Sequence, residues 1–457
     1  MKYNQKNHSQ TAHLLFGEID TTKLGRQTVT QSAITMFAQA SRFLIQLLST
    51  VALARLLIPS DFGLLAMATV LVNFVSIIKD FGLSQATVQR RQISSQQISS
   101  LFWINVGIST GLALLIALSG PLIAWVYDET RLTLVVISLS VPIVISGFGL
   151  QHRALLQRNM RFTELAIIDT SALALGVLAG IFSAWIGLGL WALVIMQVVN
   201  SMIATALVVI RVNWVPQFRY PDSESMEMLR FGLNLSLSNL LNYLSRNTDT
   251  FLIGRYLGAD ALGQYSRAYA LLIAPISQLT APLSIVFLPA LSRLKEEPKR
   301  FSELYLSLVR WVNLLTAPSA VLLAFFGSNL TVLLLGKNWH EAGDIFEVLA
   351  ITAIFQPLGN LCGLMLVALG QTDRILKWTL FSSVLIVGSF FAGISFGAIG
   401  VAAFYSFAIL VQQPILTWFT LKKSPVSLEK YLHALAPGIL VAILVLCLIY
   451  GLNLRES

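Results

Sequence analysis

The chain has 457 residues, of which 56% are hydrophobic and only 12% charged, with a net charge of +9 and a mean hydropathy of +0.74. A soluble protein carries about 25% charged residues, so this composition excludes a set of soluble domains, a disordered chain and a disulfide scaffold. It indicates an all-α integral membrane protein. Loop residues at the membrane surface then explain the positive charge, and nucleic acid is not expected as a partner.

Thirteen apolar segments are long enough, at about 20 residues, to cross a bilayer as helices. They lie near residues 29–57, 61–80, 98–126, 132–152, 164–186, 188–210, 228–254, 260–289, 304–335, 345–369, 375–396, 398–421 and 433–452. The segments lack the two-residue alternation of membrane β-barrel strands. We therefore predict thirteen membrane-spanning helices.

Lysine and arginine indicate the orientation in the membrane, because these residues collect in cytoplasmic loops. With a cytoplasmic N-terminus, 22 of the 31 Lys and Arg residues fall on the cytoplasmic side and 5 on the outer side. The remaining four fall within spans. The bias predicts a multi-pass protein whose N-terminus lies in the cytoplasm.

The sequence also contains an internal repeat at an offset of 200 residues. Residues 55–71 match residues 255–271 at five of seventeen positions without a gap. Because each repeat would hold six helices, an even number, both would start on the same side of the membrane, as in parallel-repeat transporters. The chain is thus expected to form a cytoplasmic segment, an N-lobe, a cytoplasmic linker, a C-lobe and one extra C-terminal helix. The expected boundaries are 1–26, 27–212, 213–226, 227–424 and 425–457.

Polar side chains recur every three or four residues along one face of the first and seventh predicted helices. They are Gln31, Thr35, Gln39, Arg42, Gln46 and Ser49, and Asn234, Ser238, Asn242, Ser245 and Asp249. At the 200-residue offset Arg42 coincides with Asn242. Such stripes would be costly against lipid, so we predict that they face a water-filled cavity between the lobes. Burial in helix–helix contacts is the alternative.

Four arginines lie within predicted spans, where a charge costs about 2.5–3.5 kcal/mol at the bilayer centre. Arg246 is followed three residues later by Asp249, so a local ion pair and a ligand contact are equal alternatives. Arg267 and Arg310 lie near span ends, where long side chains reach the headgroups. Arg42 has no acidic neighbour in its own helix and is the strongest candidate for binding an anion such as phosphate.

Two acidic residues fall at membrane depth in the predicted helices. Asp169 and Asp249 are candidates for coupling transport to a proton or Na⁺ gradient. For Asp249 a structural pairing with an arginine is the favoured alternative. The sequence contains no P-loop or zinc-protease motif, and its one dinucleotide-like glycine pattern joins two apolar spans without a preceding strand. We therefore predict a non-enzymatic protein without a bound cofactor or metal.

Three segments carry a resemblance to a known family. They are ARLLIPSDFG at 54–63, LQRNMRF at 156–162 and DTFLIGRYLG at 249–258. In them the chain resembles polysaccharide transporters of the multidrug/oligosaccharidyl-lipid/polysaccharide (MOP) exporter superfamily, in particular the Wzx-type flippase and colanic-acid-exporter group. The resemblance implies the MOP flippase fold, two six-helix lobes around a central cavity, in the bacterial inner membrane. Members usually have twelve or fourteen helices, so the count of thirteen leaves the side of the C-terminus open.

The resemblance implies that the protein flips an undecaprenyl-diphosphate-linked oligosaccharide, a unit of exopolysaccharide, O-antigen or capsule, from the cytoplasmic to the periplasmic leaflet by alternating access. The expected partners are this substrate, membrane lipids and the polysaccharide polymerase machinery. The implied substrate-binding residues are Arg42 and Arg246, Arg267 as a weaker match, and Gln39, Gln46 and Asn242 of the polar stripes.

Three other functions stay open on the sequence. They are a cation-coupled multidrug exporter of the same fold, a peptidoglycan-precursor flippase, and a membrane scaffold for polysaccharide assembly. A drug exporter with cationic substrates predicts a cavity richer in acidic than in basic residues. A scaffold predicts polar stripes that can be made apolar without loss of activity.

Overall fold

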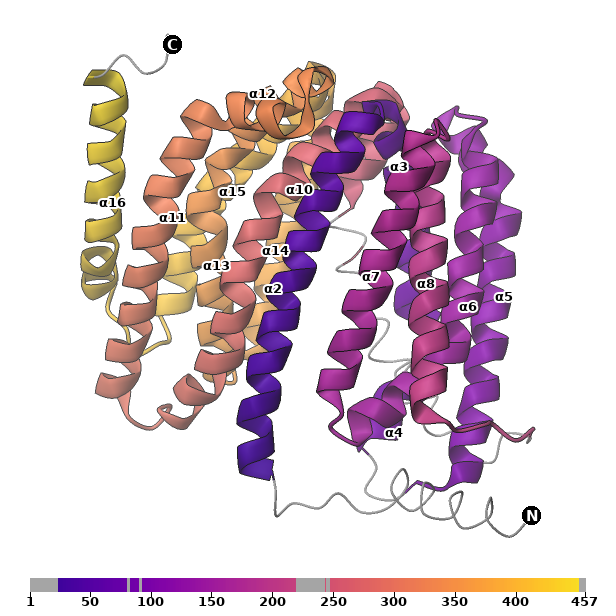
Figure 1. Cartoon of the computed structure of the whole chain (residues 1–457). Coiled ribbons are helices and arrows are strands. Elements are labelled where there is room, and N and C mark those ends of the chain that lie inside the picture. The colour runs from indigo at the N-terminus through magenta and orange to yellow at the C-terminus, as the bar shows by residue number, and fades with distance from the viewer. Residues whose placement is uncertain (1–23, 80–82, 90–92, 219–242, 244–246, 452–457) are drawn as a thin grey trace. The chain divides into compact units, whose positions relative to one another are not determined.

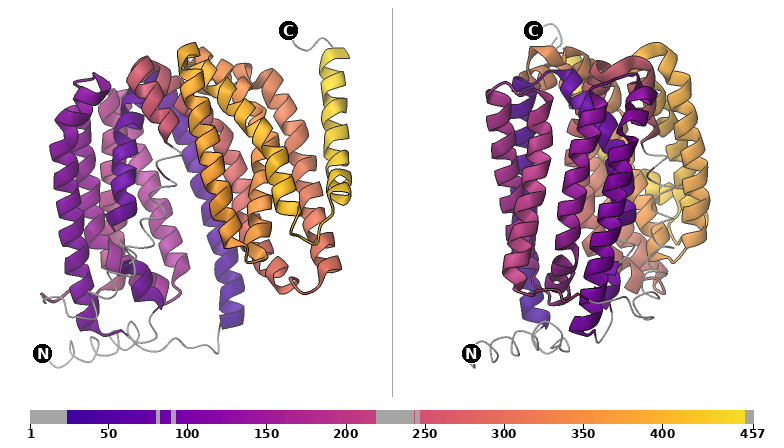
Figure 2. Two further views of the ribbon diagram at one scale, coloured as in Figure 1. Left: turned by 180° about the vertical axis from the view of Figure 1, so that it is seen from behind. Right: turned by 90° about the vertical axis from the view of Figure 1, so that its right-hand side faces the viewer.

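The structure is a computed structural model that describes residues 24–79, 83–89, 93–218, 243 and 247–451. The chain divides into two compact units, Met1–Leu244 and Ser245–Ser457. Every regular element in the described residues is a helix, as Figures 1 and 2 show for each unit. This confirms the predicted all-α class. The predicted linker from residue 219 onwards and most of the predicted seventh helix lie outside the described residues, so the exact lobe boundaries stay predictions.

The N-terminal unit contains seven described helices, six of which match the first six predicted spans. They are α2 (Leu24–Leu56), α3 (Pro59–Lys79), α4 (Leu83–Gln89), α5 (Ser95–Tyr127), α6 (Leu132–Arg158), α7 (Phe162–Trp185) and α8 (Leu190–Val212). Within this unit α5 packs on α6, α7 on α8, α6 on α8 and α2 on α7. A capping box begins α5, because the Ser94 hydroxyl accepts from the Gln97 amide and the Gln97 side chain accepts from the Ser94 amide.

The C-terminal unit contains the other helices. They are α10 (Thr248–Arg293), α11 (Pro298–Leu335), η2 (Lys337–Trp339), α12 (His340–Ala350), α13 (Thr352–Ala368), α14 (Thr372–Gly393), η3 (Ile394–Phe396), α15 (Gly397–Leu421) and α16 (Leu428–Gly451). The predicted span 345–369 is wrong as a single helix, because α12 and α13 meet at a bend of 49°. Neither Gly nor Pro stands at Ile351, where the two helices meet. Pro357 follows six residues later within α13.

The backbone is interrupted at equivalent positions of the 200-residue repeat in the two units. In the N-terminal unit α2 ends at Leu56 and α3 begins at Pro59. In the C-terminal unit the long helix α10 is interrupted at Gly258, whose φ of 88° and ψ of −178° are not helical. Residue 58 and residue 258 are 200 positions apart, so both units break the chain at the same point of the repeat.

The described helices are suited to a membrane. Eight are long and apolar enough to cross one, and up to ten if each of two bent pairs is counted as a span. One of the eight stretches, Thr372–Leu421, contains both α14 and α15, and α3 has an apolar part shorter than the others, Pro59–Val75. The thirteenth predicted span is present as α16. The chain is a multi-pass membrane protein.

The extra helix α16 packs closely against α11 at Gly438. The Asn313 side chain donates to the carbonyl of Leu435 at 2.8 Å. A Cβ atom added to Gly438 would lie 2.6 Å from the Asn313 carbonyl oxygen, closer than van der Waals contact allows. The two helices therefore approach as closely as their backbones permit.

We expect Gly438→Ala to lower the melting temperature of the detergent-purified protein, because overpacking typically costs about 1–3 kcal/mol. Gly388→Ala in α14 is the matched control, since a Cβ there would meet nothing within 4 Å. Alanine is about 0.8–1.0 kcal/mol better than glycine within a helix, so the control variant should be unchanged or more stable. Equal melting temperatures for the two variants would contradict the close approach of α16 to α11.

Candidate functional site

The most prominent polar cluster of the N-terminal unit joins three membrane helices through charged side chains. Asp169 of α7 accepts two hydrogen bonds from Arg153 of α6, with N–O distances of 2.8 and 2.6 Å. The same carboxylate receives the guanidinium of Arg42 from α2 at 3.3 Å. Two arginines thus share one carboxylate, and the cluster carries a net charge of +1. We call these three residues the arginine–aspartate cluster.

The cluster is accessible as well as paired. The side chains of Arg42, Arg153 and Asp169 are 32%, 38% and 20% exposed. Arg153 is held by two short parallel hydrogen bonds, the strongest geometry for a guanidinium on a carboxylate. Arg42 makes a single longer contact, so it is the arginine that can most readily exchange Asp169 for another anion.

The hairpin of α6 and α7 places Arg153 opposite Asp169. The chain reverses at Met160, which has a positive φ of 56°, and the amide of Arg161 bonds back to the carbonyl of Leu156. Arg153 and Asp169 each stand eight residues from Arg161, so an antiparallel pair of helices brings them level. α2 packs against α7 and adds Arg42 from the side.

The other described members of the first polar stripe lie along α2. Gln39 is half-buried and Gln46 is exposed, while Ser49 is buried with its hydroxyl 3.8 Å from the sulfur of Met196. Of the predicted binding residues in this helix, the structure joins only Arg42 to the cluster. The side chains of Gln31 and Thr35 lie outside the described residues.

The second polar stripe is described only at its end. Asp249 is buried and accepts from the hydroxyl of Tyr265 at 3.0 Å and from the amide of Thr250 at 2.7 Å. Arg246 and Asn242 lie outside the described residues, so the predicted pair of Arg246 with Asp249 stays a prediction. Arg267 is half-buried on α10.

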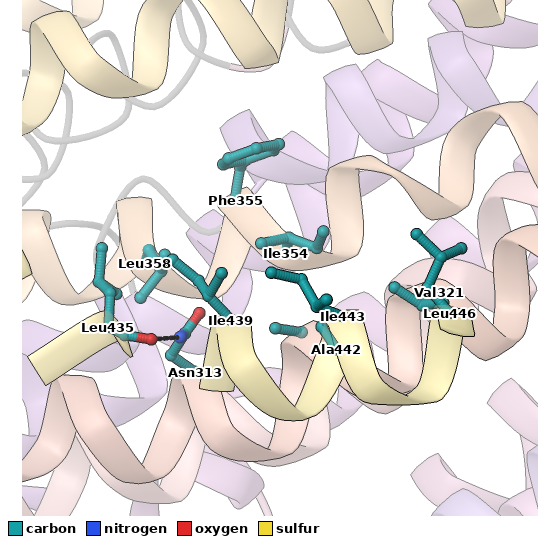
Figure 3. A pocket seen from close by; sticks show the side chains of 11 residues that line it. Asn313, Val321, Ile354, Phe355, Leu358, Leu435, Ile439, Ala442, Ile443 and Leu446 are labelled. Carbon is teal, nitrogen blue, oxygen red and sulfur yellow. Dashed lines mark hydrogen bonds between the residues drawn. The ribbon is translucent and has the colours of Figure 1, made fainter. Parts of the chain in front are cut away.

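Two cavities differ sharply in character. In the N-terminal unit α3, α6 and α8 enclose a cavity of about 390 Å³ that Arg153 and several amides and hydroxyls line. In the C-terminal unit a cavity of about 280 Å³ lies between α11, α13 and α16 (Figure 3), and its lining is apolar apart from Asn313. Among the described lining residues, a charged side chain occurs only in the first cavity.

Arg153 was missed by the sequence reasoning, which placed it in a cytoplasmic loop after a span ending at residue 152. In the structure α6 continues to Arg158. The sequence did contain a signal for this pair. Arg153 and Asp169 have opposite charges and are equally far from the turn of a helical hairpin, so they are expected to face each other. Asp169 was found, but its partners were not visible within its own helix.

Comparison with known structures defines the class. The lipid II flippase MurJ in an inward closed conformation superposes with a TM-score of 0.72 at 14% identity, over 93% of this chain and all of that one. An inward-facing MATE family multidrug transporter of the MOP superfamily gives 0.64 at 17% identity, over 83% and 94% of the two chains. The protein has the fold of MOP-superfamily exporters, as predicted.

Sequence comparison then gives the family. A match to the polysaccharide biosynthesis protein family spans residues 52–344, and the chain belongs to that family. The lipopolysaccharide biosynthesis protein WzxC of Escherichia coli is 28% identical over 81% of this chain and 76% of its own length. The teichuronic acid biosynthesis protein TuaB of Bacillus subtilis is 28% identical over 84% and 80%. The succinoglycan biosynthesis transport protein ExoT of Rhizobium meliloti is 24% identical over 83% and 76%. The predicted resemblance is confirmed.

Proposed function

We propose that this protein flips a polyprenyl-diphosphate-linked oligosaccharide from the cytoplasmic to the periplasmic leaflet of the bacterial inner membrane, by alternating access. The observation that carries the proposal is the arginine–aspartate cluster, with its excess positive charge on membrane helices. A charge on a membrane-spanning helix is costly unless it is paired or functional. Family membership and relatives named for polysaccharide biosynthesis and transport support the same substrate class.

The chemistry of the cluster suits a diphosphate. Guanidinium groups bind phosphate oxygens through two parallel hydrogen bonds, which a lysine cannot do. Asp169 holds both arginines in place before the substrate arrives, and the diphosphate then replaces it on Arg42, whose contact is the longer one. In this role Asp169 positions the arginines. Five further residues remain proposed contributors to substrate binding: Arg246, Arg267, Gln39, Gln46 and Asn242. Asp169 and Asp249 both remain proposed residues for coupling transport to a proton or Na⁺ gradient.

The proposed function is tested by deleting the gene in its own host and measuring lipid-linked oligosaccharides in each leaflet. We expect one species to accumulate on the cytoplasmic face while the surface polymer is lost, because a diphosphate and sugars do not cross hydrocarbon unaided. A plasmid copy of the gene should restore both. An unchanged lipid-linked pool and surface polymer would contradict the proposal.

The same deletion strain separates the proposal from a multidrug exporter of the same fold. An exporter of cationic drugs favours acidic cavity residues, whereas the cluster has two arginines to one aspartate. We expect no change in the sensitivity of the deletion strain to cationic drugs. Hypersensitivity together with a normal lipid-linked pool would favour the exporter.

A further inference from the structure

The polar cavity of the N-terminal unit lies beside the arginine–aspartate cluster. It lies within one unit, between α3, α6 and α8. Its volume of about 390 Å³ falls within the range of about 300–1,000 Å³ typical of small-molecule sites. Arg153 belongs to both features, since it lines the cavity and binds Asp169. A ligand in the cavity would therefore adjoin the cluster.

The described lining of the cavity carries a positive charge. Among the described residues that line the cavity, Arg153 is the one charged residue, and none carries a carboxylate. The hydroxyls of Ser146, Ser201 and Thr205 donate to carbonyls of α6 at 3.0, 3.1 and 3.3 Å. Their oxygen atoms still offer lone pairs to the cavity.

Two amides give the lining its strongest unmet hydrogen-bonding capacity. Gln197 and Asn200 stand on α8, three residues apart and therefore on one face of the helix. Both are half-buried, and neither side chain has a hydrogen-bond partner in the part of the chain that the structure describes. Each amide can donate two hydrogen bonds and accept two. Polar groups without partners in a membrane helix are costly, so they point to a ligand.

A sugar ring matches this lining better than a cationic drug or a lipid tail does. Sugar hydroxyls both donate and accept, as amides do, and the carbon face of a pyranose packs on apolar side chains. The cavity supplies such a surface at Val72 of α3 and at Ile143 and Leu150 of α6. Arg153 would hold an anionic group at the edge of the same ring.

We propose that this cavity binds the sugar that is attached to the diphosphate of the lipid-linked substrate. Gln197 and Asn200 bond its hydroxyls, and Arg153 contacts the adjoining phosphate. The inference rests on the proposed function, because it takes the diphosphate on the arginine–aspartate cluster as its starting point. It adds that the protein recognises the first sugar as well as the anchor.

The test compares two probes on the purified protein in lipid nanodiscs. One is undecaprenyl diphosphate, and the other is undecaprenyl diphosphate carrying a single hexose, chosen as the first sugar of the lipid-linked species that the deletion strain accumulates. The double variant Gln197→Ala, Asn200→Ala removes the amides. Alanine keeps the Cβ of Asn200, which an added Cβ at Gly176 would approach to 2.9 Å, so the α7–α8 contact is preserved.

We expect the wild-type protein to bind the hexose-bearing probe about tenfold more tightly, the effect of two hydrogen bonds. The double variant should bind both probes equally, with unchanged affinity for the sugarless one. Asn329→Ala, an exposed amide of α11, is the matched control and should keep the wild-type preference. Equal wild-type affinity for the two probes, or a full preference in the double variant, would overturn the sugar site and leave the proposed function standing. Wild-type protein that binds neither probe would overturn both.

A second measurement covers the case in which the double variant is unstable. Cys362 and Cys447 are first replaced by alanine, and Ala204→Cys then places one thiol on the cavity lining. The hexose-bearing probe should slow modification of this thiol by a small water-soluble maleimide at least about threefold more than the sugarless probe does, which corresponds to about 0.65 kcal/mol. Equal rates with the two probes would overturn the sugar site.

Discussion

Arg42→Gln is expected to lower transport of the lipid-linked saccharide about 10- to 100-fold while the protein stays inserted and folded. The loss corresponds to a charge-assisted hydrogen bond of about 1.5–3 kcal/mol. Stability should be preserved, because Asp169 keeps its two hydrogen bonds from Arg153 at 2.8 and 2.6 Å. The variant therefore separates a binding role from a structural one. Export is measured by surface polymer and by the cytoplasmic lipid-linked pool in a complemented deletion strain.

Two matched variants make the Arg42 result specific. Arg42→Lys keeps the charge but loses the planar fork, so we expect intermediate transport. Arg55→Gln removes an exposed arginine in the last turn of the same helix and should transport normally. Near-normal export by Arg42→Gln would remove Arg42 from the proposed site.

Asp169→Leu is expected to have the largest effect on stability of any substitution in the cluster. It leaves Arg153 and Arg42 facing each other without the carboxylate that both contact. Loss of one partner from a buried ion pair costs about 3–5 kcal/mol, and the partial exposure of these side chains reduces this to about 1–3 kcal/mol. At about 2–4 °C per kcal/mol for a unit of this size, the melting temperature should fall by several degrees.

Two double-mutant cycles distinguish the partners of Asp169. The cycle of Asp169→Leu with Arg153→Leu should give a coupling free energy of about 1.5–3 kcal/mol, as expected for a bidentate pair. The cycle with Arg42→Leu should give less than about 1 kcal/mol, because Arg42 makes one contact at 3.3 Å. In this account Asp169 holds Arg153 firmly, whereas Arg42 can release Asp169 and bind another anion. Equal coupling free energies in the two cycles would contradict this difference.

The helices were largely predictable because the membrane imposes length and apolarity on each one. Predicted span 98–126 became α5, and 433–452 became α16, each within a few residues. The break at Gly258 falls between the predicted seventh and eighth helices. The break at Ile351 was not predicted, since apolar residues continue through it.

The candidate site was only half visible in the sequence. Arg42 and Asp169 were singled out separately, because a charge in an apolar span is unusual by itself. Their meeting through Arg153 depends on how α2, α6 and α7 pack, which no local pattern contains. Spacing about the turn at Met160 would have paired Arg153 with Asp169, but it would not have added Arg42.

The most direct test of the account is lipid translocation by the purified protein in vesicles. The lipid-linked saccharide that accumulates in the deletion strain is placed in both leaflets, and an externally added glycosidase removes the sugars that it can reach. Wild-type vesicles should lose nearly all of the saccharide, and protein-free vesicles should stop at the outer-leaflet half. Arg42→Gln vesicles should lose the inner-leaflet half about 10- to 100-fold more slowly than wild-type vesicles. Wild-type vesicles that also stop at half would contradict the proposed function.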